Sequence, residues 1–462
     1  MTGARHIVVL GAGPAGLAAA VAAAPNAHVT LIDAADELGG QYWRHLPPQR
    51  PTAHEARLHH GWLRYRDLVD RIAGSRIDVV TSAQVWSLER EGERSVLHAV
   101  VGPPDAADRE RLVLRADALV IATGAHDRTL PFPGWTLPGV YSAGAAQALA
   151  KAERVAVGTR VVVAGAGPFL LPVATSVRGV GARVVGVFEA ARAPALARAW
   201  LRGSWAPLAA KAPELAGYLL QLARHRIPYR FGHAVVAAHG DGRVESVTVA
   251  RLAPDWSVMP GTERRIGADA IAVGHGFTPR LEVAIAAGCD LTPHRFVGVD
   301  DRQRTSAPGV WAAGEVTGIG GAGAALAEGA IAGADAAGVD PDRWTSGRRD
   351  RDRDVALRIE AAHGIRRGWP SWLTDETIVC RCEEVSVGRL REITGVTDST
   401  SLRSLKLTTR IGLGVCQARV CGRTVEHLLG ATGPSSDRRP IFAPVRLGEL
   451  ARPIDPNGDD KR

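Results

Sequence analysis

The sequence is poor in cysteine, in aromatic residues and in long apolar segments. Only five of its 462 residues are cysteines, and aromatic residues make up 5%. One apolar run, at 7–24, has the length of a signal peptide or a short spanning helix, but three glycines and a proline near its start argue against both. We therefore expect no transmembrane segment and a soluble, cytoplasmic protein, in which clustered cysteines serve metal or redox chemistry rather than disulfides.

The charge balance is basic but not of the kind that nucleic-acid binding requires. The formal net charge is +8, and charged residues make up 23% of the chain. The basic residues are spread along the chain without interleaved aromatic residues or a nucleic-acid motif, so we expect no nucleic-acid partner. A positive surface that faces an acidic protein partner is the better interpretation. The length suggests about two to four domains.

A glycine-rich turn follows the first apolar stretch, in HIVVLGAGPAGLAAAVAAA at 6–24. Gly11 permits the tight turn, Gly13 lets a pyrophosphate approach the backbone, and Gly16 brings a helix against the strand. The next strand, HVTLID, ends in Asp33, 22 residues after Gly11, where a carboxylate can accept from a ribose hydroxyl. Strand, turn, helix and carboxylate together predict a dinucleotide site that contains Gly11, Gly13, Pro14, Ala15, Gly16 and Asp33.

The same pattern returns in TRVVVAGAGPFLLPVATSV at 159–177, with Gly165 and Gly167, followed by a strand that ends in Glu189. Leu170 replaces the third glycine, so we expect this helix to lie farther from its strand. The second site could hold NAD(H), another adenine nucleotide, or nothing. Glu189 would favour NADH over NADPH, although Arg192 lies close enough in sequence to leave the second choice open.

A second pair of similar segments indicates a duplicated architecture. ADALVIATGA at 116–125 and ADAIAVGHGF at 268–277 each run from Ala-Asp through an apolar strand to a glycine turn. Each follows a dinucleotide motif by roughly a hundred residues, as two βαβ folds would if one were inserted in the other. The expected fold class is therefore α/β, with two Rossmann-like domains.

These motifs resemble those of the two-dinucleotide-binding-domain flavoproteins: GAGPAG at 11–16, ATGA at 122–125 and TSAPGVWAAGEVTG at 305–318. In that family an Asp follows the last glycine and holds the ribityl chain of the flavin; here Glu315 follows Gly314 and can make the same hydrogen bond. The resemblance implies FAD, with further contacts from Gly40, Gln41, Ala122, Thr123 and Gly124. A redox-active Cys-x-x-Cys is absent, which excludes a disulfide reductase, and Cys289 is expected to be a buried core thiol.

Four of the five cysteines lie close together, as Cys380-x-Cys382 and Cys416-x4-Cys421. Four thiolates from two loops suit an iron–sulfur cluster or zinc, and the Cys-x-Cys spacing favours iron–sulfur. The arrangement resembles the [2Fe–2S] domain of bacterioferritin-associated ferredoxin, which implies a small, α-rich C-terminal domain. Arg381, Lys406, Arg410 and Arg419 would stabilise the reduced cluster, or form a solvated basic face.

Nearly the whole chain resembles the α subunits of hetero-oligomeric amine dehydrogenases, a group with opine, D-hydroxyproline and proline dehydrogenases, hydrogen cyanide synthase and sarcosine oxidase. The residues that carry this resemblance are GGQYWR (39–44), LPGVYSAGAAQALAK (137–151), GAGPFLLPVA (165–174), AAGEVTGIGGA (312–322) and TTRIGLGVCQARVCG (408–422). It implies an electron-transferring subunit with FAD and a [2Fe–2S] cluster, a partner β subunit whose own FAD oxidises the substrate, an FMN between the two, and a small ferredoxin-like subunit. The alternative is a self-sufficient NAD(P)H-dependent reductase that passes electrons through the cluster to a carrier.

The expected domain plan follows from these motifs. It comprises an FAD-binding domain at 1–125 and 290–340, a second dinucleotide-binding domain at 150–280, a charged linker or exposed helix at 341–372, the [2Fe–2S] domain at 373–430 and a tail at 431–462. No catalytic residue is assigned. His59 and His60 are expected on the polar face of an amphipathic helix, His126 has a structural or functional role, and Trp43 either packs or lies near the flavin.

Overall fold

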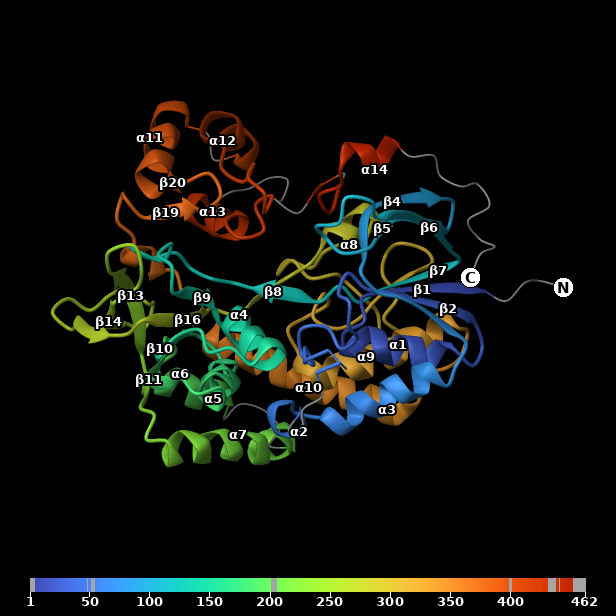
Figure 1. The fold of residues 1–462 in the computed structure, drawn as a ribbon, viewed down its shortest axis with the longest axis horizontal. Helices are drawn as coiled ribbons and strands as arrows, with labels where there is room; N and C mark the ends of the chain where they lie inside the picture. The colour runs from blue at the N-terminus through green and yellow to red at the C-terminus, as the bar shows by residue number, and fades with distance from the viewer. Residues whose placement is uncertain are drawn as a thin grey trace. The chain divides into compact units, whose positions relative to one another are not determined.

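The computed structural model describes residues 5–47, 49–50, 55–200, 206–398, 401–430, 438–439 and 441–451. The chain contacts group into two compact units (Figure 1). Unit 1 consists of Met1–Ala125, Pro279–Ala356 and Arg438–Arg462, and unit 2 of His126–Thr278 and Leu357–Asp437. The strands β8 (Ala125–Asp127) and β17 (Phe277–Pro279) mark the points where the chain passes from one unit to the other.

Unit 1 contains a five-stranded parallel sheet in the order β18-β7-β1-β2-β3. Its strands are nearly continuous apolar runs, because both faces of a parallel sheet are covered. In register, Ile7 pairs with Val29 on one side and with Ala118 on the other. The strands are β1 (His6–Leu10), β2 (His28–Ile32), β3 (Ile77–Val80), β7 (Ala118–Ile121) and β18 (Val310–Ala312).

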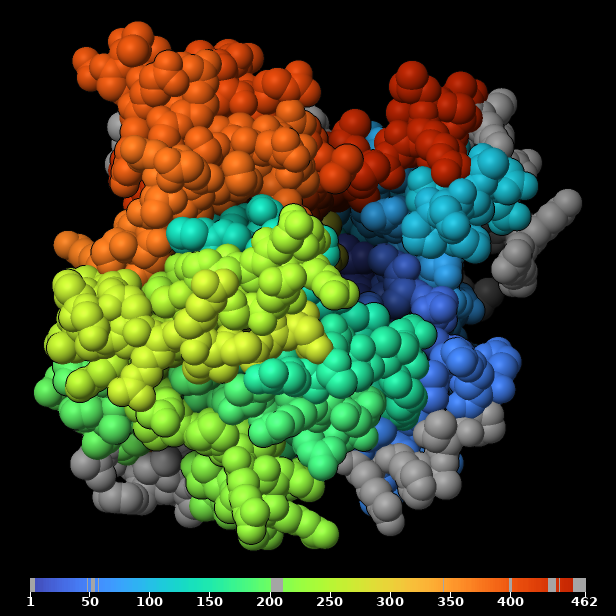
Figure 2. All heavy atoms as spheres, turned by 60° about the vertical axis from the view of Figure 1, so that its left-hand side comes forward, coloured from blue at the N-terminus to red at the C-terminus, as the bar shows by residue number. Residues whose placement is uncertain are grey.

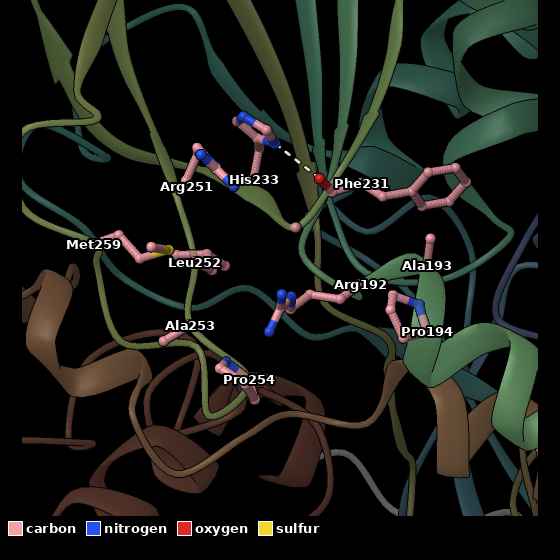
Figure 3. Close-up of a pocket in the computed structure, with 11 residues that line it drawn as sticks. Arg192, Ala193, Pro194, Phe231, His233, Arg251, Leu252, Ala253, Pro254 and Met259 are labelled. Atoms are coloured by element: carbon pink, nitrogen blue, oxygen red, sulfur yellow. Dashed lines mark hydrogen bonds between the residues drawn. The ribbon is translucent and has the colours of Figure 1, made fainter.

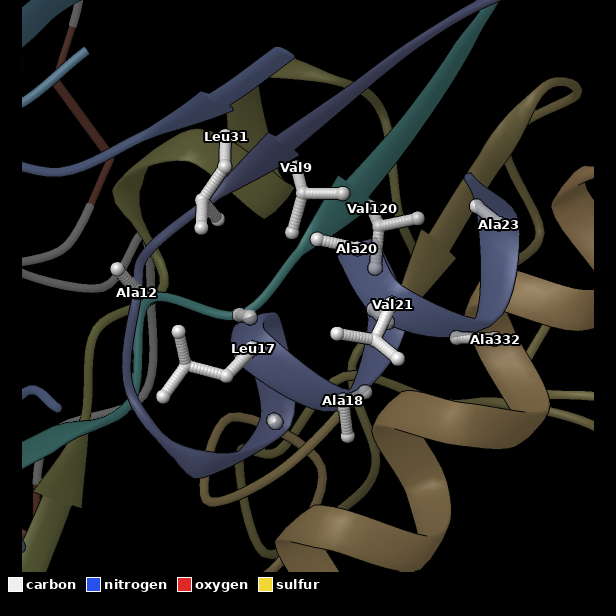
Figure 4. Packing of buried hydrophobic residues seen from close by; sticks show 14 of the residues in the cluster. Val9, Ala12, Leu17, Ala18, Ala20, Val21, Ala23, Leu31, Val120 and Ala332 are labelled. Atoms are coloured by element: carbon white, nitrogen blue, oxygen red, sulfur yellow. The ribbon is translucent and has the colours of Figure 1, made fainter. Parts of the chain in front are cut away.

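Two helices of small residues pack closely together in unit 1, α1 (Pro14–Ala23) and α9 (Gly321–Ala336). Their backbones approach so closely that a Cβ on Gly329 would lie 2.0 Å from the carbonyl oxygen of Ala15. Figure 4 shows Val9 and Leu31 of the sheet meeting Leu17 of α1 in the same buried cluster. The amphipathic helix α3 (Trp62–Ala73) also packs on α1, and α2 (Glu55–Leu58) precedes it.

An antiparallel sheet of β4 (Ala83–Glu91), β5 (Arg94–Val101) and β6 (Glu110–Ala116) completes unit 1, together with α8 (Glu282–Ala286). The C-terminal segment packs against it. The amide of Phe442 donates to the carbonyl of Trp86 at 2.8 Å, and Phe442 is buried. Arg109 and Glu449 of α14 (Leu447–Ala451) form a buried bidentate pair. The described part of 431–462 is therefore integrated into unit 1 rather than a free tail.

Unit 2 contains a second five-stranded parallel sheet, in the order β12-β11-β10-β16-β9. The two parallel sheets confirm the predicted α/β architecture with Rossmann-like sheets. The elements are β9 (Val140–Ser142), α4 (Ala143–Ala148), the π-helix η1 (Leu149–Glu153), β10 (Arg160–Gly165), α5 (Leu170–Gly179), β11 (Arg183–Glu189), α6 (Ala193–Trp200), α7 (Ala206–Arg224), β12 (Tyr229–Phe231) and β16 (Ala270–Gly274). An antiparallel sheet of β13 (His233–His239), β14 (Ser246–Arg251) and β15 (Arg264–Gly267) packs beside it.

The charged segment 341–372, which is expected to be a linker or an exposed helix, is largely helical. The helix α10 (Arg343–His363) is followed by the 3₁₀ turn η2 (Trp369–Trp372). The boundary between the two units falls inside α10, after Ala356. Trp369 and Trp372 are buried with Trp256, so the end of this segment belongs to the core of unit 2.

Four cysteines lie in a small, mostly helical part of unit 2 with its own core, which includes Leu405, Ile411 and Val425. Its elements are β19 (Ile378–Cys380), β20 (Val385–Ser386), α11 (Val387–Thr397), α12 (Leu402–Thr409) and α13 (Gly422–Leu429). In Figure 2 the orange surface of these helices adjoins the yellow-green surface of β13 and β14. Among the helices in the described ranges, none combines the length and the apolar character needed to cross a bilayer.

Candidate dinucleotide and cysteine sites

The first glycine turn meets two other predicted motifs at the carboxyl edge of the unit 1 sheet. Gly11 has φ +106°, and a Cβ there would lie 2.4 Å from the carbonyl oxygen of Ala122. On Gly16 a Cβ would clash with the carbonyl oxygen of Gly11 at 1.6 Å, and on Gly40 it would lie 2.8 Å from Gly13 Cα. Side chains are excluded at these positions, so the three motifs form one cradle of closely packed backbone.

Helix α1 begins at the glycine turn that forms part of this cradle. Its N-cap residue is Gly13, and no side chain caps the helix. The first N–H groups of an uncapped helix carry partial positive charge and bind phosphate well. Because Pro14 has no N–H, the amides of Ala15 and Gly16 are the available donors, whereas Leu17 donates to the carbonyl of Gly13.

Asp33 lies where the dinucleotide interpretation requires it, directly after β2. Its carboxylate accepts from the amides of Ala12 in the glycine turn and Ala35, the latter at 2.7 Å. An ionised carboxylate offers about four acceptor positions. Two of them remain on this partly exposed side chain, which suits a ribose hydroxyl.

The last flavin motif also approaches α1. Gly314 has φ +81°, and a Cβ there would lie 2.9 Å from Ala15 Cβ. Its amide donates at 2.9 Å to Glu328, which also accepts from Thr317 at 2.7 Å and pairs with Arg353 at 2.8 Å. Glu315 follows Gly314 and is partly exposed. Sequence reasoning missed the buried Glu328, although a carboxylate among the small residues of this helix was the available signal.

The remaining predicted residues of the first site lie in the same loops. The hydroxyl of Thr123 donates to the carbonyl of Arg280 at 2.9 Å, and the amide of Arg280 donates to Gly124. Gln41 is exposed. Trp43, by contrast, is almost fully buried, and its indole donates to the carbonyl of His60 at 3.0 Å, so its role is packing.

His59 does not lie on a polar face, which corrects the prediction for it. Its ring is buried against Trp62 and pairs with Glu55 at 2.9 Å. His60 is exposed, as expected for a polar position.

The second glycine turn differs from the first in how its acidic residue lies. Gly165 is again a close approach, since a Cβ would lie 1.7 Å from the carbonyl oxygen of Gly274. Helix α5 starts only at Leu170, whereas α1 starts two positions earlier in the motif, at Pro14. The carboxylate of Glu189 is fully buried and accepts from the amide of Gly167 at 3.0 Å.

The carboxylate of Glu189 has further hydrogen-bond and ion-pair partners that enclose it. The amide of Ala191 donates to it at 2.9 Å and the Tyr229 hydroxyl at 3.3 Å, and His363 lies 3.4 Å away. Burial and the nearby Glu189 raise the pKa of Tyr229, so this hydroxyl stays a donor. A carboxylate enclosed in this way does not reach a ribose hydroxyl. The prediction that Glu189 selects NADH over NADPH therefore loses its basis.

The four C-terminal cysteines come together as two contacting pairs. The side chain of Cys380 contacts that of Cys421, and Cys382 contacts Cys416. Cys380 and Cys421 are buried. Within the described residues no group of three or more His, Cys, Asp or Glu side chains has a ready-made metal-binding arrangement.

The surroundings of Cys380 nevertheless fit a thiolate. The hydrogen bond from Cys421, together with backbone N–H groups of Gly412, Glu383 and Cys382, lowers the pKa of the Cys380 thiol to about 6. Metal ligands must be deprotonated, and N–H groups aimed at cysteine sulfur are the contacts that tune iron–sulfur clusters. The four cysteines thus fit a sulfur-ligated metal group.

Gly412 and Gly414 are tightly packed. A Cβ on Gly414 would lie 2.3 Å from Cys382 Cβ, and one on Gly412 would lie 2.9 Å from Ala418 Cβ. Gly414 therefore allows the two cysteine loops to approach each other. Of the nearby basic residues, Arg410 pairs with Glu383 at 2.7 Å, which partly neutralises the expected cationic face.

Two side chains from elsewhere in unit 2 form hydrogen bonds with backbone carbonyl oxygens of the cysteine loops. The indole of Trp135 donates to the carbonyl of Ile378 at 2.6 Å, two residues before Cys380. A ring nitrogen of His126 lies 3.1 Å from the carbonyl oxygen of Arg419, two residues before Cys421. His126 therefore positions the second cysteine loop. The fifth cysteine, Cys289, is buried elsewhere, in unit 1, where burial raises the pKa of its thiol.

Comparison with known proteins gives related sequences over nearly the whole chain. The family model described as pyridine nucleotide-disulphide oxidoreductase matches residues 5–334. An opine oxidase subunit of Agrobacterium tumefaciens is 34% identical over 96% of this chain and 91% of its own length. The hydrogen cyanide synthase subunit HcnB of Pseudomonas protegens is 32% identical over 92% of each chain. The structure of L-proline dehydrogenase from P. horikoshii has a TM-score of 0.68 at 21% identity, over 97% of this chain and 80% of that one, and shows a shared fold.

Proposed function

The chain belongs to the pyridine nucleotide-disulphide oxidoreductase family, and on this premise we propose that it is the electron-transferring α subunit of an amine or imino-acid dehydrogenase complex. It is an FAD-dependent oxidoreductase, related to HcnB and to the opine oxidase subunit. The resemblance to α subunits of this dehydrogenase group is confirmed by these relatives.

The cradle around Gly11 is the observation that carries the proposed FAD site. Backbone segments approach one another without intervening side chains at Gly11, Gly40 and Ala122, an uncapped helix begins at Gly13, and Asp33 retains free acceptor positions. In the proposal the amides of Ala15 and Gly16 bind the pyrophosphate, Asp33 binds the ribose, and Glu315 binds the ribityl chain. When bound, FAD takes up two electrons at its ring.

The four C-terminal cysteines are the proposed ligands of a [2Fe–2S] cluster, which would accept one electron at a time. The two contacting pairs, Cys380 with Cys421 and Cys382 with Cys416, support this, as do the N–H groups aimed at Cys380. The role of this chain's residues is to hold the thiolates and to shield the buried pair from water, while His126 and Trp135 fix the loops.

The proposal includes partners. Several relatives are named as subunits, and we propose that a β subunit with its own FAD oxidises the C–N bond, that an FMN lies at the contact between subunits, and that a small ferredoxin-like subunit takes part. The second candidate is the self-sufficient reductase. The description of the matching family, which names a pyridine nucleotide, favours it, whereas the enclosed Glu189 removes one ligand that NADH would need.

Anaerobic flavin bleaching separates the two candidates. The purified chain is mixed with NADH, with NADPH and with a panel of opines, proline, hydroxyproline and sarcosine, alone and together with a candidate FAD-containing β subunit. We expect bleaching by an amine only when the second chain is present. Rapid bleaching of the isolated chain by NADH or NADPH would contradict the proposal and support the reductase.

A further inference from the structure

Unit 2 contains a pocket that lies outside both the second dinucleotide motif and the cysteine site. The pocket drawn in Figure 3 is a different one: Arg192 follows β11 and Phe231 ends β12, so its lining lies at the carboxyl edge of the second parallel sheet. The separate pocket has a volume of about 450 Å³ and is lined by η2, α11 and α13. Its volume falls within the range of small-molecule sites.

The floor of this η2–α11–α13 pocket is aliphatic. Its apolar lining residues are Pro370, Val387, Leu390, Leu428 and Leu429. Val387 and Leu390 lie three positions apart on α11 and therefore share one face of the helix, and each is 3% exposed. Among the described lining residues, the imidazole of His427 is the only aromatic ring. The fold thus provides an apolar floor without an aromatic face on which a flat ligand could stack.

The polar side chains of the pocket are donors, and its described lining includes no Asp or Glu. Arg367 and His427 are exposed at the rim. In the part of the chain that the structure describes, neither the Arg367 guanidinium nor the His427 ring makes a hydrogen bond or an ion pair. Arg391, by contrast, pairs with Asp375 at 2.6 Å. Two donors at one rim are therefore available to a ligand.

The charge around His427 favours an anion. Partial burial and the guanidiniums of Arg128 and Arg367 lower the pKa of His427, so its imidazole is neutral at pH 7 and donates through one N–H group. The same two guanidiniums attract a negative charge to this rim. An arginine guanidinium matches the two oxygens of a carboxylate in particular, because it can donate to both at once.

The segments that form the pocket are fixed by contacts with their surroundings. The buried Trp369 lies against the ring of His427, with 5.6 Å between the ring centroids. The amide of Gly368, next to Arg367, donates to the carbonyl of Asp255 at 2.7 Å. The amide of Val387, at the start of α11, donates to the carbonyl of Thr377 at 2.9 Å. The rim and the floor are therefore held in place by the fold.

Both helices of the pocket continue into the cysteine loops. Helix α13 begins directly after Cys421, which is its N-cap residue. Helix α11 follows β20, where Val385 is the register partner of Cys380. A ligand in the pocket would therefore contact the two helices that adjoin the buried pair of cysteines, although none of the four cysteines lines the pocket.

We propose that this pocket binds an aliphatic monocarboxylate, with the carboxylate between Arg367 and His427 and the hydrocarbon chain on the floor formed by α11 and α13. The chain contributes by removing apolar surface from water, and the carboxylate by its charge-assisted hydrogen bonds. The site is separate from the FAD cradle and from the cysteine ligands, and it does not depend on the proposed function.

Isothermal titration calorimetry on the full chain tests the proposal with octanoate as the probe. Octanol keeps the chain without the charge, acetate keeps the charge without the chain, and 2-naphthoate replaces the chain by a flat aromatic body. We expect octanoate to bind at one site per chain, at least about tenfold more tightly than the other three compounds.

Two pocket variants and two matched controls locate the binding site. Arg367→Ala removes the rim charge and should weaken octanoate binding by about tenfold, whereas Arg403→Ala removes the same charge at an exposed position of α12 outside the lining. Thr394→Phe fills the pocket from α11 and should abolish binding. Val396→Phe adds the same ring to α11 at a position that is 81% exposed and outside the lining. Both controls should bind octanoate like the wild type.

Four results would overturn the proposal. Octanoate that fails to bind the wild type would remove it, as would octanoate binding that neither pocket variant weakens relative to its control. Octanol that binds as tightly as octanoate would exclude the carboxylate contact with Arg367 and His427. Tighter binding of 2-naphthoate than of octanoate would exclude an aliphatic ligand.

Discussion

Replacing Gly329 by Ala tests the close packing of α9 against α1, the helix that follows the first glycine turn. A Cβ at this position would lie 2.0 Å from the carbonyl oxygen of Ala15, while real Cβ contacts below 3.0 Å are essentially never seen. Helix α9 would therefore have to move by roughly 1 Å from α1, which carries the glycine turn. Overpacking of this kind costs about 1–3 kcal/mol. We expect Gly329→Ala to lower the free energy of unfolding by about 2 kcal/mol and to reduce the FAD content.

Gly347→Ala is the matched control, because Gly347 lies in helix α10 of the same unit and a Cβ there meets nothing within 4 Å. Alanine in an open helical position stabilises by about 0.5–1 kcal/mol, so this variant should be neutral or slightly more stable. Urea unfolding and the ratio of flavin to protein absorbance measure both effects. Equal stability and FAD content in Gly329→Ala and the wild type would refute the close approach of α1 and α9.

Two further variants test how distant segments are held. Glu449→Gln removes the carboxylate that Arg109 holds at 2.7 and 2.9 Å, and should destabilise unit 1 by roughly 3 kcal/mol at pH 7 in urea unfolding. The hydrogen bonds from Arg109 hold the pKa of the Glu449 carboxyl below its usual value. The stability that the pair contributes is therefore present above about pH 4.3 and is lost as the pH falls through the folded-state pKa. At that low pH the stabilities of the variant and the wild type should converge. Trp135→Phe removes the indole donor to Ile378 and should speed hydrogen exchange in 377–382; unchanged exchange would exclude this anchor.

The geometry of the first glycine turn could be predicted from local sequence because its parts are close along the chain. Gly11, Gly16 and Asp33 lie within one strand–turn–helix–strand unit, and the backbone requirement at each glycine is steric. The meeting of this unit with Ala122 and Gly314 followed from the family resemblance, since these residues come from distant segments.

Residues whose environment is set by distant segments could not be placed in the same way. Glu189 follows the ribose-binding pattern, but Tyr229 and His363, from elsewhere in unit 2, enclose it. The sequence predicts a polar helix position for His59, whereas in the structure its ring contacts Glu55 and Trp62. Local periodicity carries no information on such tertiary partners.

The C-terminal half shows the same limit. The dense charge of 343–363 suggested a linker or an exposed helix but not that Arg349 and Arg358 of this helix are buried. The sequence after 438 did not specify that Phe442 and Glu449 pack in the first unit. The cysteine spacing, by contrast, predicted that the four thiols lie close together, and in the structure Cys380 contacts Cys421 and Cys382 contacts Cys416.

The most direct test of the proposed FAD and [2Fe–2S] groups is to measure the iron, labile sulfide and FAD contents of the anaerobically purified chain. The same contents are measured in Cys380→Ser and Cys289→Ser, a matched pair of buried-cysteine variants. We predict FAD together with iron and labile sulfide in equal amounts, about two of each per chain. Cys380→Ser should lose iron and sulfide while it keeps FAD, and Cys289→Ser should keep all three. Zinc in place of iron and sulfide, or equal iron in the two variants, would contradict the account.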